Sequence, residues 1–126
     1  MDLSSVLESR SVRGAVLFGE EHATPEERKE YIEFSKTLKK IFERLTHMKF
    51  RTSVSKTKLK NPYIEIRLKG WEPGGESIPN ELRAEIAKRL GFSGIRDWED
   101  VVYGNISRNM IALKYHEWKE VEPFIT

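Results

Sequence analysis

Cysteine and glutamine are both absent from this chain of 126 residues. The lack of cysteine excludes a disulfide framework, thiol catalysis and cysteine metal sites, so packing alone must hold the core together. A composition rich in Lys, Glu and Arg that also lacks Cys and Gln is typical of proteins from thermophiles. A thermophilic source is therefore one hypothesis for the origin of the chain.

Long hydrophobic runs are also missing. The longest, "GAVLF" and "MIAL", fall far short of the roughly 20 residues that a membrane-spanning helix needs. The first ten residues, "MDLSSVLESR", lack the basic and apolar regions of a signal peptide. We therefore expect a cytoplasmic protein with no membrane partner.

The composition is that of one folded domain with a charged surface. Hydrophobic residues make up 38% and charged residues 33%, which is more charge than usual but enough apolar material for a core. A chain of this length buries one ordinary core. We expect a single α+β domain over residues 1–126, with residues 1–12 and 121–126 as loose ends. The net charge of +2 favours no particular partner, so only the distribution of charge can do so.

The segment from Ala23 to Met48 has the strongest helical pattern. Thr24 and Glu27 have the spacing of a capping box, and Pro25 suits the first helical position. Apolar residues then recur every three or four positions, which predicts an amphipathic helix of about five or six turns. This apolar stripe consists of Tyr31, Phe34, Leu38, Ile41 and Leu45, widened by Ile32 and Phe42.

After His47 the period changes to two, which predicts two strands joined by a short polar segment as an antiparallel hairpin. Pro62 is permitted at the start of the second strand. The inner face of the hairpin should be covered by the first helix and consists of Phe50, Val54, Ile64, Ile66 and Leu68. The outer face carries Arg51, Tyr63, Arg67 and Lys69.

A loop and a second helix follow the hairpin. The glycines and prolines of residues 70–79, "GWEPGGESIP", predict the loop, and the helix should start near Pro79. Gly91 is expected to end the helix in a left-handed conformation, with Phe92 folding back on the last turn. The apolar face of this helix consists of Leu82, Ile86 and Leu90.

The chain ends are harder to interpret. Residues 97–104, "DWEDVVYG", fit a helical turn or a strand, and residues 101–113 fit a hairpin. Residues 109–115, "NMIALKY", predict a strand that ends in "HEWK", and Pro123 should end any regular element. Residues 13–19, "RGAVLFG", fit an additional strand. The order (β)-α-β-β-α-β predicts an α+β fold in which two helices pack on one small antiparallel sheet.

Signatures for metal, cofactor or nucleotide chemistry are weak. His22, His47 and His116 lack the spacing of zinc ligands, and no phosphate-binding glycine loop is present, so we expect no metal and no cofactor. One acidic pattern distantly resembles the Asp…Glu-x-Lys arrangement of restriction-type nucleases, which hold Mg²⁺ through carboxylates. The residues in this pattern are Asp97, Glu99, Asp100, Glu117 and Lys119. Glu27 and Lys29 match its Glu-x-Lys part by chance, so we favour a protein that is not an enzyme.

The predicted hairpin is the most basic part of the chain. Residues 49–60 contain five basic residues and no acid. Across residues 49–69 there are seven Lys or Arg residues and one acidic residue, Glu65. Lysines can neutralise phosphates and arginines can grip them, while hydroxyls at Thr52, Ser53, Ser55 and Thr57 would add contacts. The predicted binding residues for DNA, RNA or another phosphate-rich partner are Lys49, Arg51, Lys56, Lys58, Lys60, Tyr63, Arg67 and Lys69.

Two alternatives remain open. Lysines on an edge strand also protect it against aggregation, without any partner. The chain also fits an inhibitor or adaptor that binds another protein, including one encoded by a phage or mobile element. Trp71, in the loop, and Trp118, near the chain end, would be its anchors, because aromatic residues in such places are hard to bury fully.

Overall fold

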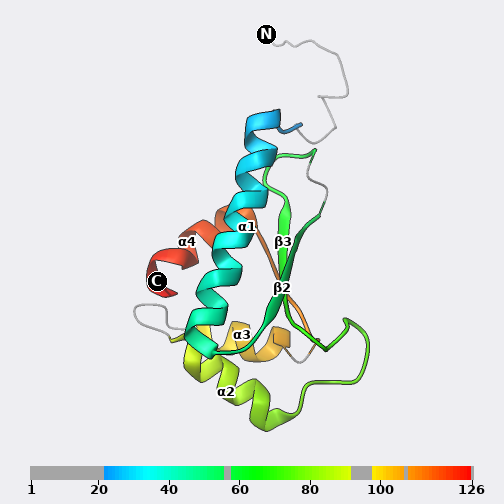
Figure 1. Cartoon of the computed structure of the whole chain (residues 1–126), viewed down its shortest axis with the longest axis vertical. Helices are drawn as coiled ribbons and strands as arrows, with labels where there is room; N and C mark the ends of the chain where they lie inside the picture. Colours follow the sequence, from blue (N-terminus) through cyan, green and yellow to red (C-terminus); the bar gives the residue numbers. More distant parts are fainter. Residues whose placement is uncertain (1–21, 56–57, 92–97, 107, 126) are drawn as a thin grey trace.

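The computed structural model describes residues 22–55, 58–91, 98–106 and 108–125. It has an α+β fold, with a three-stranded antiparallel sheet and four helices in the order α-β-β-α-α-β-α (Figure 1). The predicted fold class is therefore confirmed, with two helices more than expected. The elements are α1 (Pro25–Thr46), β2 (Phe50–Val54), β3 (Tyr63–Leu68), α2 (Asn80–Leu90), α3 (Trp98–Ile106), β4 (Ile111–Lys114) and α4 (Tyr115–Ile125). The expected strand at residues 13–19 and loose residues 1–12 lie outside the described ranges.

Helix α1 begins with the predicted capping box. Thr24 Oγ1 accepts a hydrogen bond from the Glu27 N–H at 3.0 Å, and the Thr24 N–H donates to Glu27 Oε1 at 2.8 Å. The predicted stripe is buried at Tyr31, Phe34, Leu38, Ile41 and Phe42. Ile32 does not widen it, because its side chain is 42% exposed. None of the described helices is both long and apolar enough to cross a bilayer.

The hairpin forms as predicted, and β3 becomes the central strand. β2 pairs with β3 from Phe50 opposite Leu68 to Val54 opposite Ile64, and β4 pairs with the other edge of β3. The inner positions are buried against the helices, except for Val54, which is half-buried. Figure 1 shows the helices gathered on one side of the sheet, so no described helix covers the opposite face, which we call the open face.

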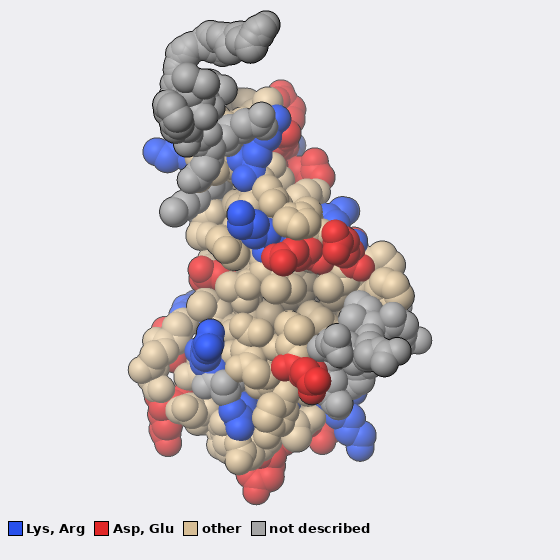
Figure 2. Space-filling model, turned by 180° about the vertical axis from the view of Figure 1, so that it is seen from behind, with Lys and Arg blue, Asp and Glu red and all other residues tan. Residues whose placement is uncertain are grey.

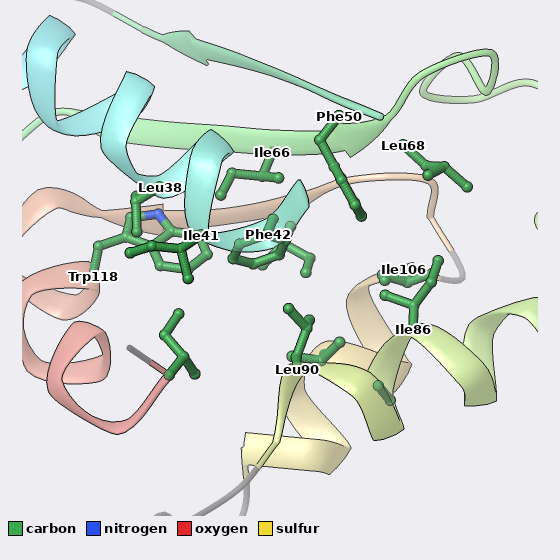
Figure 3. Packing of buried hydrophobic residues seen from close by; sticks show 14 of the residues in the cluster. Leu38, Ile41, Phe42, Phe50, Ile66, Leu68, Ile86, Leu90, Ile106 and Trp118 are labelled. Atoms are coloured by element: carbon green, nitrogen blue, oxygen red, sulfur yellow. The ribbon is translucent and has the colours of Figure 1, made fainter. Parts of the chain in front are cut away.

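The core lies between the sheet, α1 and the three shorter helices (Figure 3). Phe42 stands at its centre, with ring-centroid distances of 5.4 Å to Phe50 and 5.9 Å to Trp118. Ile86 and Leu90 bring α2 against this cluster, and both are buried. The core therefore unites elements from both ends of the described chain and fixes α1 relative to the hairpin.

The C-terminal third differs most from the prediction. Residues 98–106 form α3 rather than a strand or half of a hairpin, and β4 is shorter than the expected strand. The segment "HEWK" does not end a strand but lies in α4, and residues 121–125, expected to be loose, continue that helix. The Glu117 carboxylate accepts a hydrogen bond from the Lys114 N–H at 2.8 Å, which satisfies a backbone donor at the start of α4.

Pro123 does not end α4, as had been expected, but lies inside it. A proline in a helix removes one backbone hydrogen bond and crowds the preceding turn. The bond lost at Pro123 is the one to the Lys119 carbonyl in the preceding turn, and Ile125, the last residue of α4, is buried. Burial of this last residue thus helps to hold the final turn in place.

The predicted loop and second helix are both present. Residues 70–79 form the loop, and α2 follows Pro79 as expected. Gly91 ends α2 with a φ of 78° but a ψ of 166°, so its backbone is not in the left-handed helical conformation that was predicted. Phe92, expected to fold back on the helix, lies outside the described residues.

Candidate functional site

The outer face of the β2–β3 hairpin brings like charges together. Arg51 lies directly opposite Arg67. The Lys69 N–H donates to the Lys49 carbonyl at 2.9 Å, so these two residues continue the same register. Like charges directly opposite each other destabilise a sheet by roughly 0.2–1 kcal/mol per pair. Glu72 offsets part of this cost through a 3.0 Å ion pair with Arg67, but a sheet selected only for stability would favour opposite charges here.

A basic groove runs between α1 and the edge of β2. It has a volume of about 380 Å³, and no acidic side chain from the described ranges lines it. Its lining residues are Lys36, Lys39, Phe50, Arg51, Thr52 and Lys69. Within the described part of the chain, none of its four cationic side chains forms an ion pair. Its lining is therefore positively charged, although an acid lies beside it: the Glu43 carboxylate accepts a hydrogen bond from the Phe50 N–H at 3.0 Å.

Helix α1 and strand β2 both shape this groove. Lys36 and Lys39 are three residues apart, so they project from neighbouring positions on α1. β2 is an edge strand. The bonds from the Lys69 N–H to the Lys49 carbonyl and from the Ser55 N–H to the Tyr63 carbonyl show that alternate residues of β2 bond to β3, so the backbone N–H of Thr52 points outward. The groove therefore combines cations with an outward-pointing backbone N–H, both of which suit an anion.

The centre of the open face is polar and carries one acid. Glu65 lies opposite Ser53 and accepts a hydrogen bond from its hydroxyl at 3.3 Å. Together with Arg51, Thr52 and Arg67, these two residues line a shallow hollow of about 200 Å³. Towards the hairpin loop the face ends at Tyr63, whose side chain is 47% exposed. The acid thus separates the arginine pair from Tyr63.

A second pocket lies where the hairpin loop meets the start of α4. Its volume is about 220 Å³, and it is lined by Ser55, Leu59, Lys60, Asn61, Pro62, Tyr63 and Lys114. The Lys114 ammonium stands 5.5 Å from the centre of the Tyr63 ring. Lys60 Nζ lies 3.9 Å from a Glu27 carboxylate oxygen, at the long end of an ion pair. We refer to this feature as the loop-end pocket.

A network of hydrogen bonds fixes the floor of the loop-end pocket. The Asn61 side chain accepts from the His116 N–H at 2.9 Å and donates to His116 Nδ1 at 2.7 Å. The Asn61 N–H donates to the Tyr31 hydroxyl at 3.3 Å, and the Tyr115 N–H donates to the Pro62 carbonyl at 2.8 Å. These bonds tie the end of the hairpin loop to α1 and α4.

Tyr115 extends the same network to Glu30. Burial, and then the hydrogen bond that the Tyr115 hydroxyl donates to the Glu30 carboxylate, raise the pKa of Tyr115 well above its usual range. The phenol therefore remains a neutral hydrogen-bond donor over the whole physiological pH range. Its part in the fold is to connect α4 to α1.

The structure brings together only some of the predicted basic residues. Arg51 and Lys69 lie in the basic groove, Arg67 lies on the open face, and Lys60 and Tyr63 line the loop-end pocket. Lys49 and Lys58 are exposed but line neither groove nor pocket, while Lys56 and Thr57 lie outside the described residues.

Three further lysines belong to the site but were not predicted, namely Lys36, Lys39 and Lys114. The first two fall on the polar side of the predicted amphipathic helix, and the third falls within the predicted strand of residues 109–115. The three-residue spacing of Lys36 and Lys39 was the one signal available. Only the tertiary fold shows that this side of α1 faces the basic hairpin.

Glu117 and Lys119 are not arranged as the nuclease hypothesis requires. Glu117 and Lys119 were expected on one face of a strand, but they lie two residues apart in α4 and so point to different sides of the helix. Glu117 is engaged with the Lys114 N–H, and Lys119 lies 3.7 Å from a Glu122 carboxylate oxygen. Asp97 lies outside the described residues, and Glu99 and Asp100 are in α3.

The three histidines are distributed over separate elements. His22 forms an isolated bridge with Leu59, His47 caps the end of α1, and His116 binds Asn61. Among the residues that the structure describes, no group of three or more His, Asp or Glu side chains is placed to hold a metal ion.

The expectation that Trp118 would be hard to bury is wrong. Its side chain is 0% exposed, and its indole N–H donates to the Ile64 carbonyl at 2.9 Å. Because residues 115–125 fold back as a helix, Trp118 reaches the core although it is near the chain end. Trp71 is half-buried against the core, so neither tryptophan is a fully exposed anchor for a partner.

Charge is mixed on other parts of the surface. On the face seen in Figure 2, basic and acidic side chains are interspersed and uncharged side chains occupy the middle. No protein-family model, curated protein or solved structure matches this chain. Its function is therefore inferred from the side chains described above.

Proposed function

We propose that this protein binds nucleic acid through the basic groove and the adjoining open face of the hairpin. The observation that carries the proposal is the convergence of Lys36, Lys39, Arg51 and Lys69 on one groove that has no acidic lining residue among those described. Neutralising phosphates with lysine and arginine releases condensed counterions, which is the main source of affinity in sequence-independent binding. A groove of cations suits this role.

Protection of an edge strand accounts for only part of this arrangement. Charged side chains on β2 would discourage pairing with another chain. Lys36 and Lys39, however, belong to α1 and not to the strand itself. The like-charged pair of Arg51 and Arg67 also costs stability, whereas a pair of opposite charges would protect the edge equally well. Binding to a phosphate-rich partner would account for both the lysines on α1 and the like-charged arginine pair.

The side chains of the site would make different kinds of contact with a phosphate backbone. The lysines act as point charges that attract the phosphate backbone, while Arg51 can grip one phosphate with two parallel hydrogen bonds. The Thr52 hydroxyl and the outward N–H of Thr52 are further donors, whereas the Ser53 hydroxyl already donates to Glu65. Such contacts position a strand without reading its sequence, so we expect little sequence preference.

The double substitution Lys36→Glu with Lys39→Glu tests the proposal. It should weaken binding to a labelled oligonucleotide by at least about tenfold at low salt, equivalent to about 1.4 kcal/mol. The slope of log K against log salt should become shallower by about 1.4 for a single strand, since each lost phosphate contact contributes about 0.7. Fluorescence anisotropy over a salt series measures both quantities.

A matched control removes the effect of net charge. Lys88→Glu with Arg108→Glu changes the net charge equally, and both residues are exposed and outside the basic groove. This control should retain the wild-type affinity to within about threefold, since distant exposed charges are screened. Equal weakening in both double variants would reject the groove as the binding site. Failure of the wild-type protein to bind DNA or RNA at low salt would reject the function.

Arg51→Glu separates binding from stability. The substitution places opposite charges across the ladder from Arg67, so the free energy of unfolding should stay the same or rise by up to about 0.5 kcal/mol. Affinity for the same oligonucleotide should fall, because a cation of the groove becomes an anion. Urea denaturation followed by circular dichroism measures the first effect. A clear loss of stability would mean that Arg51 serves the fold rather than a partner.

A further inference from the structure

The loop-end pocket is too small for a whole cofactor. Its volume of about 220 Å³ falls below the roughly 300–1,000 Å³ of typical small-molecule sites. It opens at the end of the same face that carries the arginine pair. With a strand rise of about 3.4 Å per residue, Tyr63 lies roughly 14 Å from Arg67 along β3. Such a pocket suits one unit of a longer ligand that continues over the open face.

The lining of the pocket has two chemical halves. Tyr63 presents a half-exposed aromatic ring, beside which Leu59 and Pro62 add apolar surface. Positive charge comes from Lys114, whose ammonium stands 5.5 Å from the Tyr63 ring centre, and from Lys60, which also lies 3.9 Å from a Glu27 carboxylate oxygen. None of the described lining residues is acidic. A flat apolar surface beside two ammonium groups matches a nucleotide, which joins a flat base to a negatively charged phosphate.

We infer that the loop-end pocket receives one unpaired base of a single-stranded nucleic acid, which stacks on Tyr63 while its phosphate lies near Lys60 and Lys114. The inference rests on the proposed function and narrows its ligand. Bases in a duplex are covered on both faces by their neighbours, so only an unpaired base can present a face to Tyr63. Stacking on an aromatic side chain tolerates every base, which agrees with contacts that do not read sequence.

The floor of the pocket is organised before any ligand arrives. Pro62 is buried, and the backbone of Asn61 is held at a φ of 54° while its side chain is bonded to His116. The Tyr63 ring therefore projects from a backbone that is fixed on both sides, by this network and by the β3 ladder. Binding on a fixed platform loses less conformational entropy than binding on a mobile loop.

Tyr63→Ala tests this inference with two probes, an oligothymidine of about fifteen nucleotides and a duplex of similar length. Affinity for the single strand should fall about tenfold, within the range observed for removal of a base-stacking aromatic, and affinity for the duplex should change less than about twofold. Tyr63→Phe should retain the wild-type affinity for the single strand, because stacking needs the ring and not the hydroxyl. Phe124→Ala, which removes another exposed aromatic from α4, should have no effect on either probe.

The outcomes distinguish the inference from the function on which it rests. Equal loss of single-strand and duplex affinity in Tyr63→Ala, or unchanged affinity for both, would overturn stacking and leave binding at the basic groove intact. A loss in Tyr63→Phe as large as that in Tyr63→Ala would also overturn it. Absence of binding by the wild-type protein to either probe would reject both proposals.

Discussion

Trp118→Ala is expected to lower the free energy of unfolding by about 3–5 kcal/mol, the usual cost of truncating a buried tryptophan. The side chain is fully buried and stands against the rings of Phe42 and Trp98, with centroid distances of 5.9 and 6.1 Å. It connects α4 to α1 and α3. Since single domains are stable by only about 5–15 kcal/mol, much of the native stability would be lost.

Two variants separate the parts of this effect in urea denaturation. Trp118→Phe keeps an aromatic ring but leaves the buried Ile64 carbonyl without its indole donor, which should cost about 1–3 kcal/mol. Phe124→Ala removes an exposed ring from the same helix and should change stability by less than about 0.5 kcal/mol. If Trp118→Ala left stability unchanged and abolished binding to a protein partner, Trp118 would be an interface anchor after all.

The parts of the fold that the sequence predicted well are those set by local patterns. The apolar residues of α1 recur at helical spacing, and Thr24 and Glu27 mark its start whatever the rest of the chain does. In the hairpin, alternation assigned Phe50, Ile64 and Ile66 to the buried face, because a period of two has only two sides. In both cases neighbours along the chain determine the answer.

The C-terminal third was mispredicted because its structure depends on distant contacts. The residues after Leu113 alternate well enough to extend a strand, yet Tyr115 begins a helix. The Tyr115 N–H donates to the Pro62 carbonyl, and the Trp118 indole N–H donates to the Ile64 carbonyl. These bonds join residues more than fifty positions apart, which no local pattern can report. The prediction that Pro123 ends the last regular element also relied on a local rule, whereas the helix continues to Ile125, which is buried in the core.

Only the part of the candidate site that is continuous in sequence was predicted. A run of basic residues can be read from the chain, so Arg51, Arg67 and Lys69 were identified. Lys36 and Lys39 become part of the same surface only because Leu38 and Phe42 pack α1 against the inner face of the hairpin. One helix thus supplies core residues and groove residues a few positions apart. Any core substitution that shifts α1 should therefore also change the spacing of charges in the groove.

Asn109→Ala is expected to destabilise the protein by about 3 kcal/mol, through one buried side chain that holds the loop of residues 70–79. Asn109 is 2% exposed and accepts a hydrogen bond from the Ile78 N–H at 3.1 Å. Its amide donates to the carbonyls of Glu72 and Glu76 at 2.9 and 2.8 Å. Truncation leaves a buried N–H unsatisfied, at a cost of about 1–3 kcal/mol.

The backbone of Asn109 adds to this effect. Its φ of 62° is left-handed, a conformation that asparagine tolerates but that costs alanine roughly 1–2 kcal/mol. Asn109→Gly removes the same hydrogen bonds without that backbone cost, so it should be more stable than Asn109→Ala by about 1 kcal/mol in urea denaturation. Equal stability of the two variants would show that the backbone relaxes away from positive φ, whereas wild-type stability of both would show that the loop does not need its side-chain bonds. Because Glu72 pairs with Arg67, releasing the loop should also free that arginine and strengthen oligonucleotide binding per folded molecule.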